Sequence, residues 1–173
     1  MNIVLIGYRG SGKSTLGKVL ASQLGRRMVS TDQEIIRRAG TSISDIVAAH
    51  GWDYFRDLET AVCQDLAGQD ELVVDTGGGA ILRAQNVDVL KRNGRLIWLT
   101  ASVETIAARI GGDMQRPSLT GRQSHVEEIR DVLIERMPKY RAAADVTIAT
   151  DGRSIDDLAA TILQYLRTAN AHP

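Results

Sequence analysis

The chain of 173 residues carries 21 Lys and Arg against 21 Asp and Glu, so its formal net charge at pH 7 is zero. Hydrophobic residues make up 43% and charged residues 24%, which is the composition of an ordinary globular protein. The balanced charge gives no reason to expect a nucleic-acid partner or an anionic membrane surface, and no apolar stretch approaches the roughly 18 residues that cross a bilayer.

Strands and helices alternate along the chain. Short apolar runs predict strands at residues 3–6, 28–31, 72–75, 96–99 and 145–149. Helical patterns predict helices at 13–24, at 32–50 with an interruption at 40–42, at 52–66, at 85–93 closing at Gly94, at 103–110, at 126–137 before Pro138, and at 155–167. We expect Ser102 and Ser154 to cap the helices that follow them, and the polar segment 111–124 to be a mobile loop.

This alternation predicts an α/β protein. Short apolar strands flanked by helices are typical of a parallel sheet covered on both faces, which gives a three-layer α/β/α fold. The length predicts a single domain over residues 1–173. Ligands in such sheets bind beyond the carboxyl ends of the strands, so the residues that follow each strand are the candidates for function.

The cysteine and histidine content fits a protein of a reducing compartment without a structural zinc site. The one cysteine, Cys63, excludes an internal disulfide and fits the cytoplasm, and we expect it to lie on a buried helix face. The three histidines have neither mutual spacing nor cysteine neighbours, so no structural zinc site is expected. We expect a cytoplasmic monomer whose partners are small substrates rather than nucleic acid or a membrane.

The first strand leads into a phosphate-binding loop. Residues Gly7–Ser14 (GYRGSGKS) match the pattern of a glycine, four free positions and Gly-Lys-Ser. In this pattern the backbone N–H groups surround phosphate oxygens, Lys13 places a positive charge beside the terminal phosphates, and Ser14 offers its hydroxyl to Mg²⁺. The predicted nucleotide contacts are Gly10, Ser11, Gly12, Lys13, Ser14 and Thr15.

The other predicted strand ends carry residues suited to a second, acidic substrate. Asp32 follows the second strand, and Gly77, Gly78 and Gly79 follow the third. Three arginines are further candidates: Arg56 and Arg136 lie in predicted helices, and Arg116 lies in the polar loop. All three are expected at the same edge of the sheet. We expect these residues to converge on one crevice.

In the order and spacing of these residues the chain resembles the shikimate kinase family over nearly its whole length. The residues that carry the resemblance are Asp32, Phe55-Arg56-x-x-Glu59, Thr76-Gly77-Gly78-Gly79, Arg116-Pro117 and Arg136-x-x-x-Tyr140. The resemblance implies a P-loop kinase with strand order 2-3-1-4-5, ATP and shikimate as substrates, and Mg²⁺ as cofactor. It implies phosphorylation of the 3-hydroxyl of shikimate, a step toward chorismate and the aromatic amino acids.

The resemblance also implies residue roles. Asp32 would orient, and deprotonate, the attacking hydroxyl, while Arg56 and Arg136 would bind the shikimate carboxylate and Gly77–Gly79 would add backbone contacts. Lys13 and Arg116 would neutralise the transferring phosphate, and Arg116 and Arg153 would contact ATP. The acceptor-binding region would span about residues 32–60, and the lid would span about residues 111–124.

The chain departs from the family pattern at three positions. The family usually has Asp-x-Asp after the second strand, whereas this chain has Ser30-Thr31-Asp32. The position before Thr76 is usually small, whereas here it is Asp75. We hypothesise that Asp75 replaces the missing carboxylate and holds water around the magnesium ion. A third departure, Trp52, is expected to have a packing role.

Three alternatives stay open. A related small-metabolite kinase, such as one acting on gluconate, would share the phosphate loop and lid but not the acceptor motifs. A nucleoside monophosphate kinase is disfavoured for the same reason. A kinase-like binding module without catalysis is opposed by Lys13, Ser14, Asp32 and Arg116, although Ser30 keeps it open.

Overall fold

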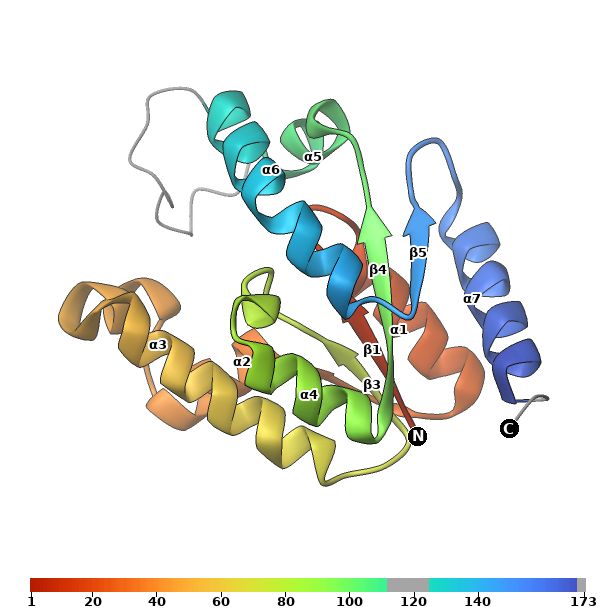
Figure 1. Ribbon diagram of the computed structural model, residues 1–173, viewed down its shortest axis with the longest axis horizontal. Coiled ribbons are helices and arrows are strands. Elements are labelled where there is room, and N and C mark those ends of the chain that lie inside the picture. The colour runs from red at the N-terminus through yellow and green to blue at the C-terminus, as the bar shows by residue number, and fades with distance from the viewer. Residues whose placement is uncertain (112–124, 171–173) are drawn as a thin grey trace.

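The computed structural model describes residues 1–111 and 125–170, and Figure 1 labels their helices and strands. In chain order the elements are β1 (Asn2–Ile6), α1 (Lys13–Leu24), β2 (Arg27–Ser30), α2 (Thr31–Ala39), α3 (Ile43–Ala67), β3 (Leu72–Asp75), the short 3₁₀ helix η1 (Ala80–Leu82), α4 (Ala84–Arg92), β4 (Gly94–Thr100), α5 (Val103–Ile110), α6 (His125–Ala143), β5 (Val146–Ala149) and α7 (Ile155–Asn170).

The five strands form one parallel sheet in the order β2-β3-β1-β4-β5, which confirms the predicted strand order. The central strand β1 pairs with β3 and with β4, so that Val4 lies between Val74 and Leu96. Because all strands run in one direction, their carboxyl ends share one edge. The phosphate loop after β1 therefore lies next to the segments that follow β3 and β4.

Helices cover both faces of this sheet, as the alternation of strands and helices predicts. Ile3 and Leu5 of β1 pack into a cluster with α1 and α7, whereas Val4 and Ile6 pack into a second cluster with α3, α4 and α6. Successive strand residues point to opposite faces, so one apolar strand serves both cores. Figure 1 shows α1 and α7 on one side of the sheet and α3, α4 and α6 on the other. Cys63 is fully buried in the second cluster, as expected.

Several predicted boundaries are wrong, and α6 differs most. The prediction ended this helix before Pro138, but α6 continues through Pro138 to Ala143. A proline removes the N–H that would bond the carbonyl four residues earlier. That carbonyl belongs to Ile134, which is 65% exposed, so water can bond it instead. Residues on both sides of the proline are buried, among them Val132 and Tyr140, and this packing holds the helix together.

Smaller differences concern the ends of other elements. Thr31 begins α2 rather than ending β2, so Asp32 lies in the first turn of a helix, and Ser30 is the N-cap that accepts a hydrogen bond from the Gln33 N–H. The break before Trp52 is a single residue, Gly51 (φ 82°), inside α3. Gly94 begins β4 rather than closing α4. The N-caps Ser102 and Ser154 are confirmed, since each accepts the N–H three residues on.

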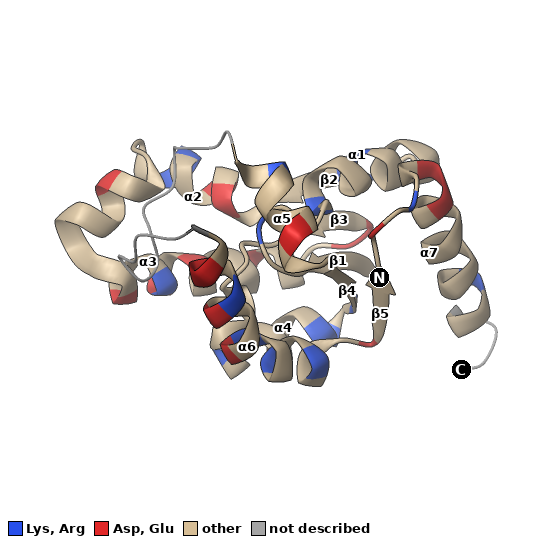
Figure 2. Cartoon of the chain, turned by 90° about the horizontal axis from the view of Figure 1, so that it is seen from above, with Lys and Arg blue, Asp and Glu red and all other residues tan. Residues whose placement is uncertain are grey.

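Charged residues of both signs are interspersed along the elements, as Figure 2 shows for α6. Of the helices that the structure describes, none combines the length and the apolar character that crossing a bilayer requires.

Candidate active site

The phosphate loop turns sharply between β1 and α1. Gly7, Gly10 and Gly12 have φ values of 144°, 78° and 99°, a region that residues with a Cβ rarely adopt. The Lys13 ammonium folds back over the loop and donates to the carbonyl oxygens of Gly7 (2.8 Å) and Tyr8 (3.0 Å). The charge of Lys13 is thus held above the loop, at the N-terminus of α1, where an anion would bind.

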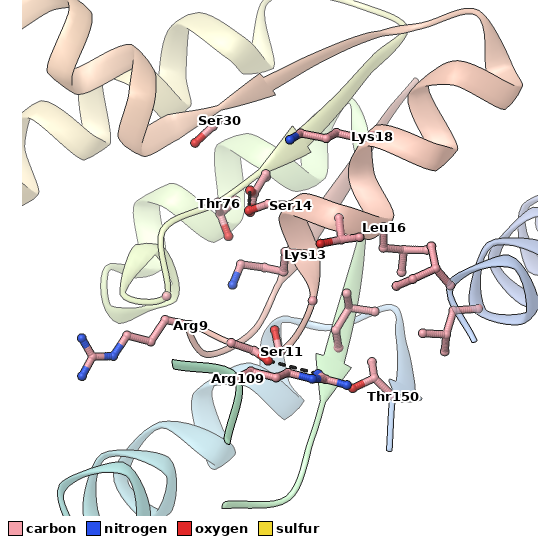
Figure 3. A pocket seen from close by; sticks show the side chains of 18 of the residues that line it. Arg9, Ser11, Lys13, Ser14, Leu16, Lys18, Ser30, Thr76, Arg109 and Thr150 are labelled. Atoms are coloured by element: carbon pink, nitrogen blue, oxygen red, sulfur yellow. Dashed lines mark hydrogen bonds between the residues drawn. The ribbon is translucent and has the colours of Figure 1, made fainter. Parts of the chain in front are cut away.

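A cavity of about 820 Å³ opens above this loop. Its lining includes all six predicted nucleotide contacts of the loop, together with Ser30, Asp75 and Arg153. Figure 3 shows Lys13 and Ser14 at the start of α1 within this cavity, and Arg9 directed away from them. The size and the loop suit a nucleoside triphosphate.

Asp75 lies against the phosphate loop. The Ser14 hydroxyl donates to Asp75 Oδ2 over 2.5 Å, and Asp75 pairs with Ser30 across β3 and β2. A carboxylate on residue 75 and one on residue 30 would therefore point into the same part of the cavity. The hypothesis that Asp75 stands in for an acid at position 30 is compatible with this geometry.

The same residues fit a magnesium ion that also binds the nucleotide. Mg²⁺ prefers oxygen ligands and commonly takes one or two protein oxygens together with phosphates and water. Ser14 and Asp75 supply such oxygens beside the loop. No group of three or more His, Cys, Asp or Glu side chains able to hold a metal exists among the described residues, so no all-protein metal cage competes with this arrangement.

The far end of the cavity is formed by α5 and the segment after β5. Arg109 donates to the Gly10 carbonyl (3.1 Å) and to the Thr150 hydroxyl (3.3 Å), as Figure 3 shows. Arg153 lines the same cavity and bonds Asp157 and Thr161 of α7. Sequence reasoning missed Arg109, although its place in the last turn of the helix after β4 was a usable signal.

A second, smaller cavity of about 50 Å³ adjoins the first. It brings together every substrate-binding residue predicted from the sequence: Asp32, Arg56, Gly77, Gly78, Gly79 and Arg136. Two of its lining residues, Tyr8 and Glu59, carry buried oxygens (Tyr8 Oη and Glu59 Oε1) that lack a hydrogen-bond partner within the described part of the chain. Buried polar atoms are rarely left unpaired, so this cavity suits a polar ligand.

Glu59 anchors the guanidinium of Arg56. The two side chains, one helical turn apart on α3, form an ion pair of 2.6 Å, and Glu59 is fully buried. Burial raises the pKa of the Glu59 carboxyl, and the Arg56 charge opposes that rise. Trp52 and Phe55 place their ring centroids 5.6 and 5.1 Å from the same guanidinium. Trp52 packs against the core, as expected, and it also lines the smaller cavity. Glu59 belongs to the sequence motif, but its part in orienting Arg56 emerges only from the structure.

The glycine run after β3 separates the carboxylates from the phosphate loop. A Cβ on Gly77 would lie 2.6 Å from Asp32 Oδ1 and 2.8 Å from Glu59 Oε1, so any other residue there would displace the two carboxylates. The Gly77 N–H donates to the Thr31 hydroxyl (2.8 Å), and the Gly78 carbonyl accepts from Arg136 (3.2 Å) and from Tyr140. Arg116, and all of the expected lid except Gly111, lie outside the described residues.

The parallel sheet, the phosphate loop and the adjoining polar cavity together define a P-loop kinase that acts on a small molecule. The family model for shikimate kinase matches residues 9–167, and the chain belongs to that family.

Relatives and solved structures agree. A shikimate kinase of Persephonella marina is 42% identical over 96% of this chain and 99% of that relative. A shikimate kinase of Symbiobacterium thermophilum is 43% identical over 96% of this chain and 97% of its own length. The solved structure of shikimate kinase from Acinetobacter baumannii in complex with shikimate has a TM-score of 0.92 and 39% identity, covering 97% of this chain and 93% of that one.

Proposed function

We propose that the protein transfers the terminal phosphate of ATP to the 3-hydroxyl of shikimate, giving shikimate 3-phosphate on the route to chorismate and the aromatic amino acids. The observation that carries this proposal is the junction of the two cavities. Arg9, Asp32 and Gly78 line both of them. A phosphate held by the loop and a hydroxyl held beside Asp32 would therefore meet at one place.

The smaller cavity has the chemistry of a hydroxylated carboxylic acid. Arg56 and Arg136 offer planar forks of N–H donors, which match a carboxylate with two hydrogen bonds. Asp32 is 8% exposed and supplies an acceptor for the attacking hydroxyl. Glu59 holds Arg56 in place, so that this guanidinium is oriented before the ligand binds.

Phosphoryl transfer depends chiefly on position and charge, because the transition state is loose. Lys13 provides a positive charge above the loop, and Arg116 is proposed to add a second one from the lid. Ser14 would hold Mg²⁺ directly and Asp75 through water; when bound, the ion neutralises charge on the phosphates. Arg109 and Arg153 form the wall that the adenine base would contact.

We further propose that the chain works in the cytoplasm as one monomeric kinase domain.

Removal of Arg136 should weaken shikimate binding selectively. A hydrogen bond to a charged group contributes about 1.5–3 kcal/mol, so Arg136→Ala should raise the KM for shikimate at least about tenfold with little change in the KM for ATP. Steady-state kinetics with each substrate varied in turn would measure this. Arg153→Ala serves as the control and should affect ATP rather than shikimate. Equal weakening of both substrates by Arg136→Ala would contradict the assignment.

Exchange of the carboxylate between positions 75 and 30 tests the magnesium hypothesis. Asp75→Ala should raise the Mg²⁺ concentration for half-maximal rate by about tenfold or more, because one charged contact is lost. The double variant Ser30→Asp, Asp75→Ala should restore most of that loss, since the two positions pair across β2 and β3. Aspartate is also a good N-cap, so α2 keeps its cap. An unaltered Mg²⁺ dependence in Asp75→Ala would refute the hypothesis.

A comparison of three acceptors, namely shikimate, gluconate and AMP, tests the proposed function itself. ADP release with Mg²⁺-ATP should be rapid with shikimate and near background with gluconate or AMP. Turnover with gluconate or AMP alone would favour one of the rival kinases. ATP binding by a folded protein without turnover on any acceptor would favour the binding module.

A further inference from the structure

The carbonyl oxygen of Gly78 accepts two hydrogen bonds from one helix. Arg136 donates from Nη1 over 3.2 Å, and the Tyr140 hydroxyl donates to the same oxygen. The two donors lie four residues apart on α6, which places them on one face of the helix. Gly78 itself lines both cavities, so its peptide stands where the acceptor meets the nucleotide.

Tyr140 is more deeply buried than Arg136, which is 8% exposed. Its side chain is 1% exposed, and its ring stacks on Trp98 of β4 with the centroids 5.6 Å apart and the planes at 15°. Trp98 pairs with Ile6, the residue before the phosphate loop. Burial raises the pKa of the Tyr140 phenol, so the hydroxyl stays protonated and remains a donor near neutral pH.

The Gly78 peptide also packs closely against the phosphate loop. A Cβ at Gly78 would lie 3.5 Å from both the Gly7 oxygen and the Arg9 nitrogen, and 3.7 Å from the Tyr140 hydroxyl. A rotation of this peptide would therefore disturb the loop and the acceptor cavity together. The donors to the Gly78 carbonyl oppose such a rotation, in addition to the backbone hydrogen bonds that Ala80 and Leu82 donate to Gly77 and Gly79.

Arg136 has two possible hydrogen-bond acceptors. In the structure its guanidinium bonds the Gly78 carbonyl. Under the proposed function it binds the carboxylate of the substrate, and a two-pronged contact that uses Nη1 would take this donor from the carbonyl. The carbonyl then depends on its remaining donor. A polar group left unpaired by binding would oppose binding.

We propose that Tyr140 is a positioning residue: it holds the Gly78 carbonyl while Arg136 turns from that carbonyl to the substrate carboxylate. This inference rests on the proposed function, because it takes the carboxylate-binding role of Arg136 from it. Tyr140 itself touches neither substrate. It keeps the peptide between the two cavities in place in the free and in the bound protein, whereas Arg136 does so only in the free one.

A double-mutant cycle tests this exchange, with the Kd for shikimate measured by titration calorimetry. Tyr140→Phe should raise the Kd for shikimate about threefold to tenfold in the otherwise unchanged protein, because the carbonyl loses its last donor only when shikimate binds. In the Arg136→Ala background the same change should leave the Kd within about twofold, because there the carbonyl lacks a donor both before and after binding. The Kd for ATP, measured without shikimate, should stay within about twofold in each single variant, because one donor still holds the carbonyl there.

Thermal unfolding without ligand should show the opposite pattern. Tyr140→Phe should lower Tm little in the unchanged protein, where Arg136 still bonds the carbonyl, and more in the Arg136→Ala background. Tyr165→Phe on α7 is the matched control, because it removes a tyrosine hydroxyl on the other face of the sheet, and it should change neither quantity. If Tyr140→Phe melts below the assay temperature, Tyr140→Met keeps an apolar side chain of similar reach without the hydroxyl.

The outcomes separate this inference from the function beneath it. Equal effects of Tyr140→Phe on the shikimate Kd in both backgrounds, or no effect in either, would overturn the exchange while leaving the kinase assignment intact. Failure of the unchanged protein to bind shikimate would overturn the proposed function and this inference with it.

Discussion

Replacement of Asp32 by asparagine is expected to lower kcat with shikimate by about 10²- to 10⁴-fold, the usual contribution of a positioned acid or base. Asparagine has nearly the same shape, so the cavity stays filled, but the amide cannot take the proton of the attacking hydroxyl. Asp32 lies at the junction of the two cavities and is 8% exposed, so its carboxylate stands where the hydroxyl and the phosphate would meet. Initial rates at saturating ATP and shikimate measure the effect.

The matched control for that variant is Asp53→Asn. Asp53 is an exposed carboxylate of α3, the helix that also carries Arg56 and Glu59, and its loss should leave kcat within about twofold. A kcat for Asp32→Asn within tenfold of the unchanged protein would mean that Asp32 only binds the substrate. The role of base would then have to be abandoned.

The second large effect is expected from Lys13→Met. Removal of one preorganised charge or donor at developing negative charge typically lowers kcat by about 10²–10³. Lys13 is a cation held directly over the phosphate loop. Methionine keeps much of the apolar stem but not the charge. Rates at saturating ATP, together with the Kd for ATP, separate lost catalysis from lost binding.

Lys13 also bonds two carbonyls of the loop, so its loss could disorder the loop itself. The thermal midpoint of the ligand-free variant therefore belongs to the experiment. Lys91→Met is the control, because it removes the same charge from an exposed lysine that forms only a long ion pair of 3.8 Å with Asp145, and such pairs contribute little. If Lys13→Met folds normally and retains more than a tenth of the original kcat, the electrostatic role is wrong.

Much of the acceptor site could be predicted from sequence because a parallel sheet gathers strand ends at one edge. Asp32, Gly77–Gly79 and Arg136 are far apart in the chain, yet the resemblance named them and one cavity contains them all. Their chemical roles remain predictions. The strand order could be predicted in the same way, through the family, and is confirmed.

What sequence could not supply is the partner of each side chain. Glu59 stood in a known motif, and its spacing from Arg56 allows an ion pair along one helix, but its complete burial depends on how α3 packs against the glycine run. Arg109 sits on an ordinary helix, and only the position of α5 beside the phosphate loop brings it to Gly10. The contact of Tyr140 with the Gly78 carbonyl depends on the continuation of α6 through Pro138. There, tertiary packing outweighs the local preference of proline to end a helix.

The central claim is that phosphate passes from ATP to one particular hydroxyl of shikimate, and the product tests it most directly. The protein should be incubated with Mg²⁺-ATP and shikimate, and the reaction followed by ³¹P and ¹H NMR. We predict one new phosphomonoester, coupled to the proton on C3, that forms in equal amount with ADP and is almost absent with Asp32→Asn. ADP that accumulates with inorganic phosphate, or a phosphate on the 4- or 5-hydroxyl, would contradict the account.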